Sequence, residues 1–164
     1  MIVIGVDPGL ATTGIGILES VGNKINVLGY GVIKTQAKTE LPQRLKKIYD
    51  ELSGLIEKYK PDVVVHEKVF FCNNAKTAIL IGEAIGVIKL ACINLNLNVA
   101  EYTPLQVKQA IVGYGFATKD QVGKMIQIVL GLKEIPKPDD AADALAIAFA
   151  YINLNKFTDT GKRK

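Results

Sequence analysis

The sequence predicts an α/β protein with a five-stranded mixed sheet flanked by helices. The first 34 residues show three strand patterns joined by short turns, which is typical of antiparallel strands. Further strand patterns then alternate with helical ones, which favours parallel additions to the same sheet. With 164 residues, 49% of them hydrophobic, the chain has the size of one domain. We place that domain at residues 1–154 and expect a polar tail at 155–164.

The first three strands form the antiparallel part. Residues 2–6 are a nearly unbroken apolar run, typical of a buried central strand, and the run stops at the turn sequence Asp7-Pro8-Gly9. Residues 13–19 and 24–34 predict two more strands joined by a turn at Gly22-Asn23. Asp7 is therefore expected at the end of a strand.

A helix and a parallel strand follow. Apolar residues recur at helical spacing through residues 41–59, namely Leu41, Leu45, Ile48, Leu52, Leu55, Ile56 and Tyr59. After Pro61, residues 62–67 are rich in valine and predict a buried strand. Because a helix leads into it, this strand is expected to run parallel to the first, with Glu67 near its carboxyl end.

The helix predicted at residues 74–93 is apolar on nearly every side. It is expected either to form a subunit interface or to lie buried within one subunit. Residues 98–102 predict a fifth strand, and residues 104–112 and 119–130 predict two helices separated by Gly113-Tyr114-Gly115.

The last helix is expected to begin after Pro136 and Pro138, with Asp139 as its cap, and to end near residue 154. Asp140 and Asp143, spaced i and i+3, then project from one face near its positive end. The remaining residues, 155–164, are polar and basic, and we expect them to be disordered.

Composition favours a nucleic-acid partner. The net charge is +4, and all but two of the 20 basic residues are lysine, which favours diffuse phosphate contacts over base reading by arginine. The two cysteines, Cys72 and Cys92, form no metal or redox motif, and a single histidine argues against a zinc site. No signal peptide and no uncharged membrane-spanning run is visible, so a cytoplasmic protein without membrane contact is expected.

Four carboxylates carry the functional prediction. Asp7 and Glu67 each end a strand, and Asp140 and Asp143 begin the last helix, so one fold could gather them. Gathered carboxylates repel one another unless a cation neutralises them, and Mg²⁺ prefers oxygen ligands. The pattern indicates a phosphodiester nuclease with two metals roughly 3.5 to 4 Å apart. Each acid alone could equally be a turn or capping residue.

Five motifs taken in order resemble the bacterial RuvC family of Holliday-junction resolvases across residues 1–153. They are Ile4-Gly5-Val6-Asp7-Pro8-Gly9, Thr13-Gly14-Ile15-Gly16, Glu67-Lys68-Val69-Phe70, Gln106-Val107-Lys108-Gln109 and Asp140-Ala141-Ala142-Asp143-Ala144-Leu145-Ala146. The resemblance implies a ribonuclease H-like fold, a homodimer, and paired nicking of four-way DNA junctions in recombination and repair. It also implies Mg²⁺, two per active site with Mn²⁺ as a substitute, and association with the branch-migration helicase proteins RuvA and RuvB.

The family's catalytic and metal-binding acids fall on the same four residues, and its basic active-site residues fall on Lys108 and Lys119. Phe70 matches an aromatic that stacks on an unpaired DNA base, although the neighbouring Phe71 competes for that role because successive strand residues face opposite sides. Without the resemblance, the lysines would be solvated surface and Phe70 a core residue. At Ile85 the family would have arginine, so a polar or DNA contact there is not expected.

Because successive residues of a strand face opposite sides of the sheet, His66 is expected to point away from Glu67 and to be a packing residue.

Other functions stay open. An RNA-processing nuclease of the same fold and a catalytically silent junction-binding protein would share the expected basic surface. An actin-like ATPase is a further alternative, because the first turn resembles a phosphate-binding hairpin, but the chain lacks a second such loop.

Overall fold

The structure is a computed structural model that describes residues 1–68 and 75–160, with only the backbone described for residues 156–160. Its centre is a five-stranded sheet with the order β3-β2-β1-β4-β5. The strands are β1 (Ile2–Asp7), β2 (Thr12–Val21), β3 (Lys24–Lys34), β4 (Val63–Glu67) and β5 (Asn98–Tyr102). The predicted mixed sheet is thus confirmed.

The pairing of the strands follows the prediction. β1 pairs antiparallel with β2, β2 pairs antiparallel with β3, and β1–β4 and β4–β5 are parallel pairs. Gly22, with φ +58°, provides the left-handed conformation that the tight turn between β2 and β3 requires. β1 is the central strand and is buried from Val3 to Val6, as its apolar run indicated.

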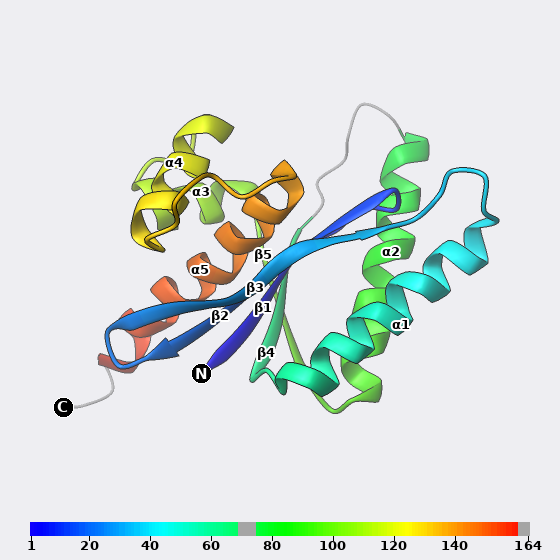
Figure 1. Ribbon diagram of the computed structural model, residues 1–164, viewed down its shortest axis with the longest axis horizontal. Helices are drawn as coiled ribbons and strands as arrows, with labels where there is room; N and C mark the ends of the chain where they lie inside the picture. The colour runs from blue at the N-terminus through cyan, green and yellow to red at the C-terminus, as the bar shows by residue number, and fades with distance from the viewer. Residues whose placement is uncertain (69–74, 161–164) are drawn as a thin grey trace.

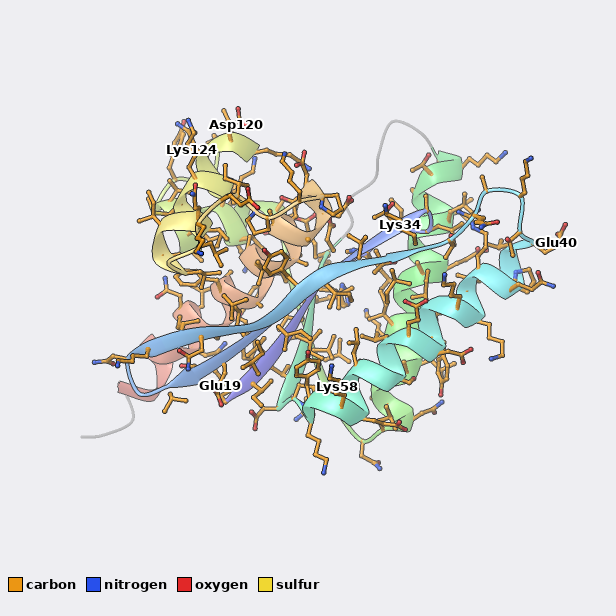
Figure 2. The ribbon with its side chains drawn as sticks, in the orientation of Figure 1. Glu19, Lys34, Glu40, Lys58, Asp120 and Lys124 are labelled. Carbon is orange, nitrogen blue, oxygen red and sulfur yellow. The ribbon has the colours of Figure 1, made fainter. Side chains whose placement is uncertain are left out.

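Helices cover both faces of the sheet (Figure 1). α1 (Leu41–Tyr59) and α2 (Ala75–Asn94) lie on one face, and α3 (Pro104–Val112), α4 (Lys119–Val129) and α5 (Asp139–Thr160) lie on the other. Each face has its own core. Ile48, Leu52 and Ile88 pack against the sheet on the first face, and Val107, Ile126 and Leu145 on the second. Charged side chains such as Glu19, Glu40 and Lys58 lie at the periphery (Figure 2).

α5 packs directly on the backbone of β1 and β2, because glycines leave room for it. A Cβ added at Gly5 would lie 2.1 Å from the Ala144 carbonyl oxygen, and one at Gly16 would lie 2.5 Å from the Leu145 backbone nitrogen. A real Cβ could not approach so closely. The glycines therefore set the distance between the sheet and the helix that carries Asp140 and Asp143.

The last helix differs from its prediction at both ends. Asp139 is the first helical residue rather than the cap, and its carboxylate accepts a hydrogen bond from Lys137 Nζ at 2.7 Å. The helix continues to Thr160, so the prediction that it ends near residue 154 is wrong. Neither glycine nor proline interrupts residues 139–160, and the Asn155 amide donates to the Tyr102 hydroxyl at 3.3 Å. Residues 161–164 lie outside the described residues.

α2 has one buried and one exposed apolar face, so it is not buried on every side, and its role as a subunit interface stays a prediction. Ala84, Ile88, Ala91 and Cys92 are buried against the rest of the domain, whereas Ile79, Leu90 and Ile93 are 63%, 53% and 65% exposed. Within the described residues, α2 is also the one helix whose length and composition would suit a membrane span, although 22% of that stretch is buried in this domain. Length and composition alone are weak evidence for a membrane span.

Candidate functional site

Parallel pairing brings two of the predicted acids to one edge of the sheet. β1 and β4 are in register with Val6 opposite His66, so Asp7 and Glu67 both leave the sheet at its carboxyl-terminal edge. A pocket of about 220 Å³ opens there. Its polar lining is formed by Asp7, Glu67, Lys108, Lys119 and Asp143. Five of the six residues expected in the catalytic machinery therefore line one pocket.

Asp140 lies beside this pocket rather than in its lining. Gly14 is the register partner of Asp7, and a Cβ added at Gly14 would lie 2.0 Å from the Asp140 carbonyl oxygen and 3.1 Å from the Asp7 Cβ. The Asp140 carboxylate also helps to raise the pKa of Asp7. The first turn of α5 thus brings both of its acids to the end of β1.

Two acids of the pocket, Asp7 and Glu67, have raised pKa values because they are buried close to other carboxylates. Burial and the charges of Asp143, Glu67 and Asp140 together raise the pKa of Asp7 to about 7, against the opposing effect of Lys119. Burial and then Asp143 likewise raise the pKa of Glu67, against the opposing effect of Lys119 and Lys108. A strongly raised carboxyl pKa in a pocket is typical of a functional site.

Lys119 supplies the positive charge nearest to the acids. Its Nζ donates to Asp143 Oδ2 at 2.9 Å, and this hydrogen bond raises the pKa of Lys119. Among the described residues, no three His, Cys, Asp or Glu side chains lie close enough together to hold a metal ion in this arrangement. In this arrangement the Asp143 carboxylate is paired with the Lys119 ammonium group.

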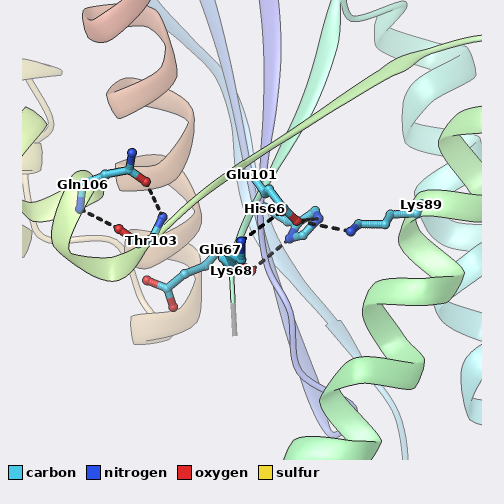
Figure 3. Close-up of polar contacts among 7 residues, drawn as sticks. All are labelled: His66, Glu67, Lys68, Lys89, Glu101, Thr103 and Gln106. Atoms are coloured by element: carbon cyan, nitrogen blue, oxygen red, sulfur yellow. Dashed lines mark hydrogen bonds and ion pairs between the residues drawn. The ribbon is translucent and has the colours of Figure 1, made fainter. Parts of the chain in front are cut away.

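Each of the two helices that carry the lysines begins at a capping box. Thr103 caps α3 through a reciprocal pair of hydrogen bonds with Gln106, at 3.2 Å and 2.9 Å (Figure 3). Thr118 caps α4 in the same way through Gln121. Lys119 is therefore the first residue of a well-defined helix.

His66 lies on the opposite side of β4 from the Glu67 carboxylate, as strand alternation predicted (Figure 3). The ring is 1% exposed, and its Nδ1–H donates to the Glu67 carbonyl oxygen at 2.9 Å. Within residues 1–68 and 75–160 its Nε2 has no hydrogen-bond partner, and it lies 3.7 Å from Glu101 Oε2; burial lowers the pKa of His66. His66 is thus a buried polar residue and not only an apolar packing group.

Of the remaining residues singled out by sequence, Phe70, Phe71 and Cys72 lie outside the described residues. Ile85 lines a separate pocket on the α2 face of the sheet, together with His66, Lys68, Lys89 and Glu101. No single-residue signal in the sequence pointed to the network that Glu101 forms there with Lys89 at 3.2 Å and Lys68 at 3.6 Å.

The sheet order and the acids at the carboxyl ends of β1 and β4 define a ribonuclease H-like protein. The model of the family described as crossover junction endodeoxyribonuclease RuvC matches residues 3–151. The chain belongs to this family, and its class is that of a crossover junction endodeoxyribonuclease. The fold, family and enzyme class expected from the resemblance are thereby confirmed.

The similarity extends along the whole chain. Crossover junction endodeoxyribonuclease RuvC of Caldicellulosiruptor saccharolyticus is 56% identical over 153 residues, covering 93% of this chain and 92% of that protein. The enzyme of the same name from Alkaliphilus oremlandii is 49% identical over 164 residues, with both chains fully covered. A structure of T. thermophilus RuvC in complex with a Holliday junction substrate superposes with a TM-score of 0.88 at 32% identity, covering 96% of each chain.

Proposed function

We propose that this protein resolves four-way DNA junctions by paired, divalent-metal-dependent nicks, with Asp7, Glu67, Asp140 and Asp143 as the metal-binding acids. The observation that carries the proposal is that Asp7, Glu67 and Asp143 line one pocket with Asp140 beside it, where burial and the other three acids raise the pKa of Asp7. A carboxylate held in this way gains most from a bound cation. The donor set contains only oxygen, which suits Mg²⁺ or Mn²⁺ and not zinc.

The side chains of the pocket divide the work between them. A bound divalent cation would supply charge neutralisation and an activated water when present. Asp7 and Glu67 would hold it from the ends of two paired strands, and Asp140 and Asp143 would hold it from the first turn of α5. Lys119 would then turn from Asp143 toward the scissile phosphate, and Lys108 would bind the same strand. The products carry 5′-phosphate and 3′-hydroxyl ends.

The substrate of the proposal is the four-way junction, which the relative from T. thermophilus holds in its complex. By the family resemblance, Phe70 would stack on an unpaired base, and RuvA and RuvB would be partners in the bacterial cytoplasm. Family membership removes the actin-like ATPase alternative. Membership of the crossover junction endodeoxyribonucleases likewise argues against the RNA-processing and catalytically silent alternatives, and the experiment tests both.

The test offers the protein a synthetic four-way junction, its linear duplex arms and a structured RNA, each with and without Mg²⁺. We expect symmetric nicks in the junction only, and only when metal is present. Cleavage in EDTA, or equal cleavage of the duplex arms, would contradict the proposal. Tight junction binding without product at any Mg²⁺ or Mn²⁺ concentration would favour the silent binding protein.

We further propose that the exposed face of α2 forms a homodimer. Ile79, Leu90 and Ile93 recur at helical spacing on one side of α2, where Gly82 and Gly86 would let a second helix approach closely. A junction of near two-fold symmetry that is cut in two strands suits a two-fold dimer.

Replacing Leu90 and Ile93 together by glutamate should turn the dimer into a monomer, because two charges would be buried in an apolar contact. Sedimentation equilibrium measures the change, and circular dichroism should show an unchanged fold, since both side chains are exposed in the monomer. The monomer should lose paired cutting. Ile128→Glu on α4, where the side chain is 71% exposed, is the matched control. A double variant that remains dimeric would place the interface elsewhere.

A further inference from the structure

The segment between α3 and α4, residues 113–117, presents two aromatic rings to solvent. Tyr114 is 61% exposed and Phe116 is 75% exposed. Their ring centroids lie 5.7 Å apart at an interplanar angle of 54°, so the two rings touch but do not cover each other's faces. We call this segment the aromatic loop. Neither ring belongs to the core of the domain.

The aromatic loop is held firmly although its tip is exposed. Gly113 adopts the left-handed conformation, φ +76°, that ends α3, and its N–H donates to the Gln109 carbonyl at 2.9 Å. A Cβ at Gly115 would lie 2.8 Å from Leu105 Cγ, so the loop lies tightly on the first turn of α3. Ala117 is 2% exposed. The rings are therefore presented on a fixed backbone, which lowers the entropy cost of a stacking contact.

The loop is continuous with the candidate active site. α3 carries Lys108 and α4 begins with Lys119, and both lysines line the pocket of the four acids. Phe116 precedes Lys119 by three residues, so their Cα atoms lie within roughly 11 Å of each other. Along one DNA strand this span corresponds to about three nucleotides. A strand that places its scissile phosphate at the pocket can thus reach the rings with a nearby base.

We propose that Tyr114 and Phe116 form a base-stacking platform for an unpaired or splayed nucleotide about three steps from the cut. The inference rests on the proposed function and adds a DNA contact to it. Aromatic rings beside lysines are the usual composition of surfaces that bind unpaired nucleic acid, because bases stack on the rings while lysines hold the backbone. Lys124 adds a further positive charge to the outer surface of α4, where Asp120 also projects (Figure 2).

The test measures junction binding in EDTA and cleavage in Mg²⁺ for the wild type, for the double variant Tyr114→Ala with Phe116→Ala, and for Phe116→Trp. The double variant should bind the junction about tenfold to a hundredfold more weakly, whereas Phe116→Trp should bind like the wild type. The slope of log affinity against log salt should not change, because no phosphate contact is lost. Tyr30→Ala on β3, where the ring is 44% exposed, is the matched aromatic control.

A junction series with 2-aminopurine placed at each position within about four nucleotides of the cut locates the contact. One position should change its fluorescence on binding, and the double variant should lose that change. Wild-type affinity and fluorescence in the double variant, with junction cleavage intact, would overturn the platform and leave the proposed function standing. A double variant that binds DNA normally but changes its state of association would assign the rings to a protein contact, which also overturns it. A wild type that neither binds nor cuts the junction would instead contradict the proposed function.

Discussion

Asp7→Asn should lower the rate of junction cleavage by about a hundredfold to a thousandfold or more and leave junction binding unchanged. Asp7 lies at the end of the central strand, and the charges of Asp143, Glu67 and Asp140 all raise its pKa. Asparagine has nearly the same shape but cannot carry the negative charge that a divalent cation needs. A gel assay with a labelled junction measures cleavage, and a shift assay in EDTA measures binding.

The same variant has a defined effect on stability in the metal-free protein. The pKa of Asp7 is about 7 in the folded state against the ordinary value of 3.8, so the folded state binds the proton more tightly than the unfolded state does. The stability that this proton provides is fully present below about pH 4 and is lost as the pH rises through 7. Asparagine resembles the protonated acid. At pH 8 in EDTA, Asp7→Asn should therefore exceed the wild type in free energy of unfolding by on the order of 2 to 4 kcal/mol.

Thermal unfolding in EDTA at pH 5 and pH 8 tests this pH dependence. The gap between Asp7→Asn and the wild type should be clearly smaller at pH 5 than at pH 8. Added Mg²⁺ should stabilise the wild type more at pH 8 than at pH 5, because the metal competes with protons, and should stabilise the variant little. A variant that melts well below the wild type at both pH values would mark Asp7 as a structural turn residue, and one that cleaves at the wild-type rate would remove it from the proposed mechanism.

The sequence could place the four acids at element ends because each lies at a boundary that local patterns define. Asp7 follows an apolar strand and precedes Pro8-Gly9, and Asp143 begins an apolar helix, so both could be placed at element ends without knowledge of the fold. That Asp7 and Glu67 meet at one edge of the sheet followed from the expected parallel pairing of β1 and β4. Strand alternation also placed His66 on the far side of β4 from the Glu67 carboxylate.

Long-range contacts were beyond these patterns. The hydrogen bond from Lys119 to Asp143 joins residues on two helices, and the network around Glu101 joins β4, β5 and α2. The end of α5 was misjudged because the polar residues after Leu154 resemble a tail. Asn155 is nevertheless placed to bond with Tyr102 across the domain. Such contacts depend on three-dimensional packing, which local propensity does not contain.

The glycines of β1 and β2 show the same limit and connect the fold to the site. Within strands, Gly5, Gly14 and Gly16 would by propensity alone weaken the sheet. In the folded domain they let the backbone of α5 approach the sheet, and Gly14 lies between the Asp140 carbonyl oxygen and Asp7. The position of two proposed metal ligands therefore depends on the absence of a side chain on the neighbouring strand.

Gly14→Ala should consequently damage both stability and activity. Its Cβ would lie 2.0 Å from the Asp140 carbonyl oxygen, so the start of α5 must move away from β2. Overpacking of this kind costs about 1 to 3 kcal/mol in free energy of unfolding, or more where backbone must move. A displacement near 1 Å at the acids should lower cleavage by about a hundredfold. Urea unfolding and the junction assay measure the two effects.

Gly31→Ala on β3 is the matched control, because nothing lies within 4 Å of its added Cβ. It should leave cleavage unchanged and should keep or slightly raise the free energy of unfolding, since alanine is the less flexible residue in a strand. Gly16→Ala separates the two effects of Gly14→Ala. Its Cβ would meet α5 at Leu145, within the apolar part of the helix, so its stability loss should be at least as large. If Gly14→Ala kept wild-type cleavage while unfolding as easily as Gly16→Ala, close packing of α5 would serve the fold alone and not the placement of the acids.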